Sequence, residues 1–185
     1  DHVLLQAASH LRTTVGQALV IAPYSHAWPA TFAAEAALLQ AAFRPRRVDV
    51  EHIGSTAVPG LGAKPIVDIL LGAESLAAIE ERVLALHSWG YCYVRDVEKV
   101  LPERRYFVKP ETGPQTIHLH AVVRGSPFWI EHLAFRDALR ADAGLAKKYL
   151  ALKKDLARRF SEQREAYTDG KAAFIRGVLD AFAPP

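Results

Sequence analysis

Several features that assign a protein to a specialised class are missing from this sequence. It has a single cysteine, Cys92, so an internal disulfide is impossible and we expect a reducing, cytoplasmic environment. No apolar run approaches the roughly 20 residues that a bilayer span requires, and the first residues lack the pattern of a signal peptide. The chain begins at Asp1 and contains no methionine, so we expect the protein to start further upstream.

The sequence also lacks a strong excess of positive charge. The formal net charge of +3 is compatible with a phosphate-bearing ligand. The chain lacks a basic stripe interleaved with aromatic residues, which is typical of single-stranded nucleic-acid binding. We therefore expect a small-molecule ligand, with a partner protein as a further option, and neither a nucleic acid nor a membrane.

What is present is the pattern of one mixed domain. The 185 residues suffice for a single core, and strand patterns gather in the middle of the chain with helical patterns at both ends. This order predicts an α+β fold in which helices flank a small mixed sheet and the C-terminal part is helical. We expect helices at 3–19, 29–43, 75–90, 127–142, 144–165 and 169–182, and strands at 20–28, 46–53, 65–71, 91–97, 104–110 and 115–123.

The loop after the second expected strand, "HIGSTAVPGLGAK", has the composition of a phosphate loop but fits neither common motif. Pro65 stands where a Walker loop needs its hydroxyl and where a dinucleotide loop needs its third glycine. The segment Gly54-Ser55-Thr56 remains, with two hydroxyls and backbone N–H groups that could face an anion. Taken alone, the segment favours a helix cap, which Ser55 or Thr56 would provide, over an anion site.

Asp68 is the partner that an anion site requires. In an extended "PIVDILL", Asp68 shares one face of the strand with Ile66 and Leu70. An ionised carboxylate among apolar neighbours loses several kcal/mol of hydration unless it is paired, bound to a metal or open to a cleft. The alternative is a structural aspartate paired with an arginine.

Long motifs in this chain resemble the GrpB family, which is assigned to the nucleotidyltransferase superfamily. The resemblance runs over about residues 20–177, so it treats residues 1–20 as a peripheral N-terminal helix and 21–185 as one nucleotidyltransferase-like domain. It rests on "EHIGSTAVPGLGAKPIVDILL", "RRYFVKP", "HLHAVVRGSPFWIEHLAFRDALRA", "YLALKKDLA" and "YTDGKAAFI".

The resemblance implies roles for the loop and the aspartate. In the superfamily a Gly-Ser loop holds the triphosphate, and a carboxylate on the next strand holds divalent metal; Ser55 and Asp68 match this spacing. The superfamily pattern also has a second acid two residues later, where this chain has Leu70, and a third acid on a later strand, where this chain has "HLH". These departures put ordinary two-metal transfer in doubt.

The histidines of "HLH" are candidate site residues. His118 and His120 share one face of a strand, with Cα atoms about 7 Å apart, close enough to share a metal or flank a phosphate. A neutral histidine could instead serve as a general base. Glu51 is a candidate second carboxylate, with a solvated surface charge as the alternative. We predict Asp68, His118 and His120 as catalytic residues, and these three with Glu51 as ligands of Mg²⁺ or Mn²⁺, or of Zn²⁺ in view of the imidazoles.

Basic side chains could hold the phosphates. Arg105 and Lys109 share one face of "RRYFVKP", opposite Arg104, although charge on an edge strand would give the same pattern. Lys64 lies between the loop and the Asp68 strand, and the resemblance implies a helical lysine such as Lys171 near the nucleotide. The predicted phosphate-binding residues are Gly54, Ser55, Thr56, Lys64, Arg105, Lys109 and Lys171.

Three functions fit these residues. The first is a metal-dependent transfer of a nucleotidyl group from a nucleoside triphosphate to a small acceptor. The second is a nucleotide-binding or regulatory module that kept the fold without the second acid; GrpB-type domains fused to dephospho-coenzyme A kinases favour such a helper role. The third is a metal-dependent hydrolase built on Asp68, His118 and His120.

Overall fold

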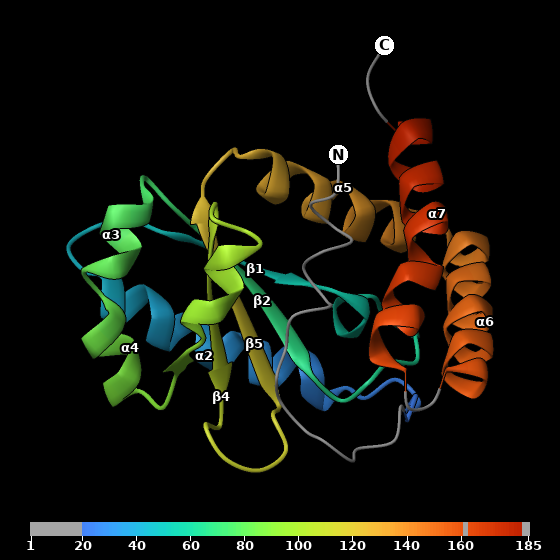
Figure 1. Cartoon of the computed structure of the whole chain (residues 1–185), viewed down its shortest axis with the longest axis horizontal. Coiled ribbons are helices and arrows are strands. Elements are labelled where there is room, and N and C mark those ends of the chain that lie inside the picture. The colour runs from blue at the N-terminus through green and yellow to red at the C-terminus, as the bar shows by residue number, and fades with distance from the viewer. Residues whose placement is uncertain (1–19, 161–162, 183–185) are drawn as a thin grey trace.

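The computed structural model describes residues 20–160 and 163–182, so the predicted helix at 3–19 lies outside the described residues. Helices and strands alternate in the first two thirds of the described chain, and three helices follow (Figure 1). The strands are β1 (Asp49–Ile53), β2 (Val67–Ala73), β3 (Cys92–Tyr93), β4 (Arg104–Lys109) and β5 (Ile117–Val123). The helices are α2 (Ala27–Phe43), α3 (Leu76–Glu80), α4 (Val83–Ser88), α5 (Pro127–Ala141), α6 (Ala143–Arg159) and α7 (Arg164–Phe182), with 3-10 turns η1 (Ser55–Ala57) and η2 (Arg95–Lys99).

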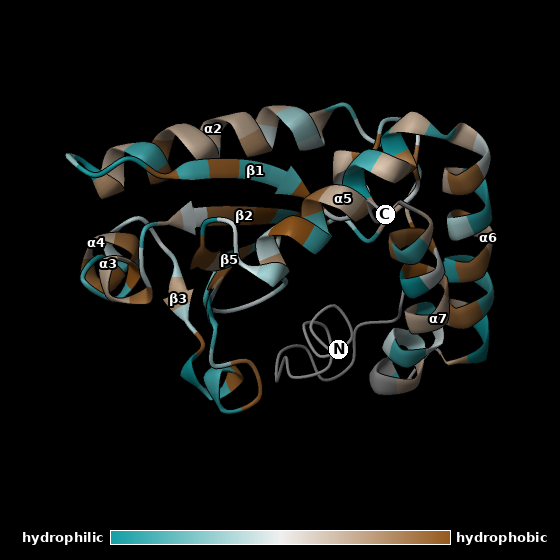
Figure 2. Ribbon diagram, turned by 90° about the horizontal axis from the view of Figure 1, so that it is seen from above, coloured by the Kyte–Doolittle hydropathy of each residue, from teal (hydrophilic) through white to brown (hydrophobic). Residues whose placement is uncertain are grey.

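The five strands form one mixed sheet in the order β1-β2-β5-β4-β3, as the α+β prediction requires. β2 and β5 are parallel, and the other neighbouring pairs are antiparallel. β2 lies between β1 and β5, which explains its nearly continuous apolar sequence, drawn largely brown in Figure 2.

The two faces of the sheet have different partners. Side chains such as Ile69 and Leu119 join a large core cluster with Leu39 of α2 and Ile79 of α3. Figure 2 shows α2 running along this side of the sheet. On the other face, Leu70 belongs to a smaller cluster built with α5. The side chain of Asp68 lies on that second face, where it keeps 30% exposure.

The C-terminal helices cover the loop that follows β1. α6 and α7 lie side by side (Figure 1), and a Cβ atom added at Gly170 would be 2.4 Å from Leu156 Cδ2, so the glycine permits their close approach. Val58 and Leu61 from the loop join an apolar cluster with Tyr149 of α6. Within the described residues, the helices all fall short of the length and apolar content needed to cross a membrane.

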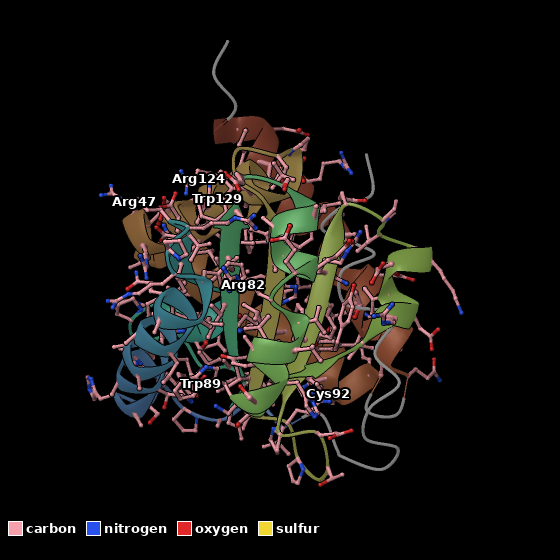
Figure 3. The ribbon with its side chains drawn as sticks, turned by 90° about the vertical axis from the view of Figure 1, so that its left-hand side faces the viewer. Arg47, Arg82, Trp89, Cys92, Arg124 and Trp129 are labelled. Carbon is pink, nitrogen blue, oxygen red and sulfur yellow. The ribbon has the colours of Figure 1, made fainter. Side chains whose placement is uncertain are left out.

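Three expected elements are shortened or interrupted. The predicted strand at 20–28 is reduced to an isolated bridge between Ala22 and Ala63, and α2 begins within that range at Ala27. The predicted helix at 75–90 breaks at Arg82, whose φ of −102° and ψ of 1° are not helical, and it forms α3 and α4. The predicted strand at 91–97 keeps only β3, because the chain then turns into η2. Cys92 is half-buried on β3, and Trp89, which is 44% exposed, lies at the same end of the molecule (Figure 3).

Candidate functional site

The loop after β1 rests directly on Asp68. Gly54 has φ 71° and ψ −174°, a conformation that glycine adopts readily and other residues avoid. A Cβ atom at Gly54 would lie 2.6 Å from Asp68 Oδ2, so a side chain there would collide with the carboxylate. η1 begins at the next residue, and the Ala57 N–H donates to the Gly54 carbonyl at 3.2 Å. A short 3-10 turn therefore follows the strand.

Asp68 meets both predicted histidines. Its Cα pairs with Ile53 of β1 on one side and with His118 of β5 on the other. Asp68 Oδ1 lies 3.4 Å from His118 Nδ1 and 3.4 Å from His120 Nε2. The structure thus brings the three predicted catalytic residues together at one carboxylate oxygen.

These contacts determine the protonation states of Asp68 and His120. Burial alone would raise the pKa of Asp68, but hydrogen bonds from His118 and His120 outweigh it and hold the pKa well below the usual range. Burial and the charge of Arg104 outweigh the opposing effect of Asp68 and lower the pKa of His120 to about 4. At neutral pH Asp68 is therefore an anion and His120 is a neutral imidazole.

Arg104 is a member of this site that the sequence analysis passed over. It is only 1% exposed, and its Nη1 lies 3.0 Å from His120 Nδ1. Its guanidinium carbon is 4.9 Å from the ring centre of Tyr106 and 5.5 Å from that of Phe128. In the register of β4 and β5, Tyr106 pairs with His120, so Arg104 and Tyr106 lie on the Asp68 face.

Arg105 and Lys109 lie on the opposite face, contrary to the prediction that they hold phosphate beside Asp68. The predicted alternation of β4 is confirmed, but its orientation in the sheet is the reverse of the one that prediction needs. Arg105 Nη2 is 2.6 Å from Glu80 Oε1, and Lys109 Nζ is 2.9 Å from Glu35 Oε1. Both charges are engaged in ion pairs of the core face.

Glu51 and Thr56 have structural partners. Glu51 shares the Asp68 face, but its carboxylate lies 2.6 Å from Arg136 Nη1, so the predicted second metal ligand is already in an ion pair. Thr56 is 1% exposed, and its Oγ1 lies 3.0 Å from His52 Nε2. Thr56 therefore braces the loop from inside and does not offer its hydroxyl to a ligand.

Lys153 of α6 contacts the loop although it is distant from the loop in the sequence. It is 3% exposed, and its Nζ donates to Ser55 Oγ at 2.8 Å and to the Gly62 carbonyl at 2.7 Å. The Nζ also lies 5.0 Å from the ring centre of Tyr149. Burial and, to a lesser extent, the charge of Lys171 together lower the pKa of Lys153 to about 7.

A buried position of Lys153 could have been recognised from helical spacing. Tyr149, Lys153, Leu156 and Ala157 are the buried residues of α6 and lie on one stripe of the helix. A lysine within an apolar stripe is unusual and indicates a specific partner. That the partner is Ser55, 98 positions earlier, has no local signal.

The other predicted cations lie around this pair. Lys171 is half-buried on α7, with its Nζ 4.5 Å from the ring centre of Tyr167, and its charge acts on Lys153. Lys64 is half-buried between η1 and β2, as its place in the sequence predicts. Lys153 thus brings a cationic group to the loop at Ser55, with the charge of Lys171 acting on it, and Asp68 brings a carboxylate at Gly54.

The residues present fit only one kind of metal site. Within the described residues, no group of three or more His, Cys, Asp or Glu side chains could hold a metal ion. Leu70, at the position of the second acid, is fully buried, and His120 has both ring nitrogens engaged. A single partly exposed carboxylate suits a Mg²⁺-type ion that takes its other oxygen ligands from phosphate and water. A site with histidine ligands is not assembled.

Comparison with known proteins relates this site to a family. The family model described as "GrpB protein" matches residues 18–181. A crystal structure of the conserved protein GrpB from Enterococcus faecalis is 34% identical, with a TM-score of 0.79, over 88% of this chain and 96% of that chain. A crystal structure of the Cid1 poly(U) polymerase, 14% identical, has a TM-score of 0.52 over 79% of this chain and 49% of that chain, which shows a shared nucleotidyltransferase-like fold alone.

Sequence relatives differ in how much of their length is matched. UPF0157 protein YqkA of Bacillus subtilis is 35% identical over 83% of this chain and 44% of its own length. Glutamate-rich protein GrpB of Alkalihalophilus pseudofirmus is 33% identical over 88% of this chain and 94% of its own length. A dephospho-CoA kinase of Mycolicibacterium paratuberculosis is 30% identical over 84% of this chain and 44% of its own length. The chain spans less than half of the first and third of these relatives, and it belongs to the GrpB family.

Proposed function

We propose that this chain binds a nucleoside triphosphate through Ser55 and Lys153, beside Asp68, and transfers its nucleotidyl group to a small acceptor. The observation that carries the proposal is the Lys153 ammonium. Within the described residues it meets the neutral oxygens of Ser55 and Gly62 and the ring of Tyr149, and no carboxylate.

A buried ammonium without an anion is costly, because two neutral hydrogen bonds do not replace its hydration. An anionic phosphate at Ser55 would supply the missing charge. Gly54 leaves the backbone exposed at this point, so a phosphate can approach the start of η1 closely. Lys171 adds a second cation from α7. The loop therefore supports binding of a polyphosphate better than binding of a neutral ligand.

Asp68 supports a reaction at this site. Its carboxylate is ionised, and it lies next to the phosphate loop. Asp68 would hold a divalent ion, and the chemistry that such an ion would supply is polarisation of the phosphate and orientation of the acceptor. Lys153 and Lys171 would stabilise the charge that develops on the leaving pyrophosphate. The acceptor hydroxyl would attack the α-phosphorus, the bond to pyrophosphate would break, and the hydroxyl proton would pass to solvent.

The second candidate is a module that binds the nucleotide without transferring it. Leu70 favours this function, because the position that would hold the second acid is fully buried and apolar. The similarity to part of a dephospho-CoA kinase is consistent with a helper domain in a larger protein.

Isothermal titration with ATP, GTP, CTP and UTP, with and without Mg²⁺ or Mn²⁺, tests the shared claim and separates the two candidates. Transfer predicts metal-dependent binding that Asp68→Asn abolishes, together with pyrophosphate release in a screen of hydroxyl-bearing acceptors. The module predicts binding that is indifferent to metal and to Asp68→Asn. Arg105→Gln is the matched control, because Arg105 lies on the other face, and it should bind as the wild type does. Absence of binding to every triphosphate would contradict both.

A further inference from the structure

We infer that Arg104 fixes His120 as a hydrogen-bond donor to Asp68, so that His120 positions the carboxylate and is neither a metal ligand nor a base. This role rests on the proposed function. The three side chains come from neighbouring strands, with Arg104 on β4, His120 on β5 and Asp68 on β2. In the strand register His120 pairs with Leu70 and Tyr106, so the arrangement runs diagonally across the sheet.

The chemistry of arginine decides the tautomer. A guanidinium has only N–H donors, so at 3.0 Å from Arg104 Nη1 the His120 Nδ1 must accept. An imidazole that accepts at Nδ1 carries its proton at Nε2. That nitrogen is the one 3.4 Å from Asp68 Oδ1, and it therefore donates to the carboxylate. Neither ring nitrogen of His120 keeps a lone pair directed at a ligand.

Arg104 is held firmly enough to impose this choice. It is 1% exposed, and its guanidinium lies near the rings of Tyr106 and Phe128, where contacts between a cation and an aromatic face are favourable. A side chain enclosed in this way has few alternative rotamers. The donor to His120 is thus part of the packed structure and does not depend on a ligand.

The consequence is an oriented carboxylate. Asp68 Oδ1 accepts from His120, and Oδ2 is the oxygen that lies against Gly54 at the start of the loop. Oδ2 is therefore the oxygen presented to a cation or a phosphate-bound ion at the loop. In the same way, side chains that bind a metal are oriented by hydrogen bonds from the residues behind them.

A neighbouring histidine gives an internal contrast. His132 of α5 has its ring 6.4 Å from that of His120, and its Nδ1 lies 2.8 Å from the Phe128 carbonyl. A carbonyl only accepts, so His132 carries its proton at Nδ1. The two adjacent imidazoles should therefore be opposite tautomers.

Long-range ¹H–¹⁵N NMR of the histidine side chains, in the free full-length protein at pH 7.5, tests this assignment. We expect His120 to show a protonated Nε2 and a bare Nδ1, and His132 to show the reverse. A proton on His120 Nδ1 would overturn the inference. The measurement needs no nucleotide, so it separates the failure of this inference from the failure of the proposed function.

Substitution of His120 tests its positioning role. His120→Gln can place an amide donor near the position of Nε2, and His120→Leu cannot. The dissociation constant of ATP with Mn²⁺ should rise at least tenfold in His120→Leu and be largely restored in His120→Gln, with both variants folded by circular dichroism. Equal losses in the two variants would contradict the role of the donor, and so would unchanged binding in His120→Leu.

Discussion

Lys109 and Lys153 are both largely shielded from solvent, but they differ in what they meet. On the α2 side of the sheet, Lys109 Nζ lies 2.9 Å from Glu35 Oε1, and Glu35 also accepts a hydrogen bond from Tyr91 at 2.6 Å. At the η1 loop, Lys153 meets two neutral oxygens. A buried charge with its counter-charge holds the fold together, whereas a buried charge beside neutral acceptors is available to a ligand.

Neighbouring residues of β4 repeat the contrast. Arg105 points to the core face and pairs with Glu80, while Arg104 points to the Asp68 face and donates to a neutral imidazole. The alternation of one strand therefore divides its two cations between a structural and a site role. Which residue is which depends on the orientation of the strand in the sheet.

The largest loss of stability should follow substitution of Gly54. At this position the backbone is in close contact with Asp68, and no ion pair is involved. Gly54→Ala should lower the free energy of unfolding by about 3 kcal/mol, from backbone strain and from the collision with Asp68 Oδ2. Gly60→Ala is the control, because Gly60 also has a positive φ, 77°, but would meet no atom within 4 Å. It should cost about 1 kcal/mol. If urea unfolding gave the same loss of unfolding free energy for both variants, the contact with Asp68 would not contribute to stability.

The next largest loss of stability should follow substitution of Lys109, the lysine that is paired with Glu35. Lys109→Met leaves Glu35 without its cation, and we expect a loss of about 2 kcal/mol, discounted for the partial exposure of Lys109. Lys153→Met removes a cationic group that has no counter-charge among the described residues, so at pH 7 it should stay within about 1 kcal/mol of the wild type. Chemical denaturation of both variants measures the difference. A loss in Lys153→Met as large as that in Lys109→Met would remove the distinction.

The pH dependence should give a graded effect, smaller in each pH unit than the loss expected in Lys109→Met. Burial lowers the pKa of Lys153 from 10.5 to about 7. Between these values the unfolded chain binds one more proton than the folded chain, so the contribution of Lys153 to stability rises with pH from about 7 to about 10.5. The slope is at most about 1.4 kcal/mol per pH unit. It should appear in the wild type minus Lys153→Met difference, and a flat difference over this range would contradict a buried, weakly basic lysine.

Local patterns predicted the elements of the site well. The alternation along "IHLHAVV" placed His118 and His120 on one face of their strand, because a strand has a side-chain period of two. That Asp68 lies on the same face of the sheet follows from the register of β2 and β5. The loop at Gly54 followed from its glycine and hydroxyl residues. Relations between distant segments were not accessible in this way. The orientation of β4 and the approach of Lys153 to Ser55 depend on tertiary packing, so the site was predicted with Arg105 where the structure has Arg104, and without Lys153.

The most direct test of the account is the affinity of the wild type, Lys153→Met and Lys109→Met for ATP with Mn²⁺, measured by titration calorimetry at pH 7.5. We expect the wild type and Lys109→Met to bind with similar dissociation constants, and Lys153→Met to bind at least tenfold more weakly. Equal affinity in the wild type and Lys153→Met would contradict the claim that this buried ammonium receives the phosphate.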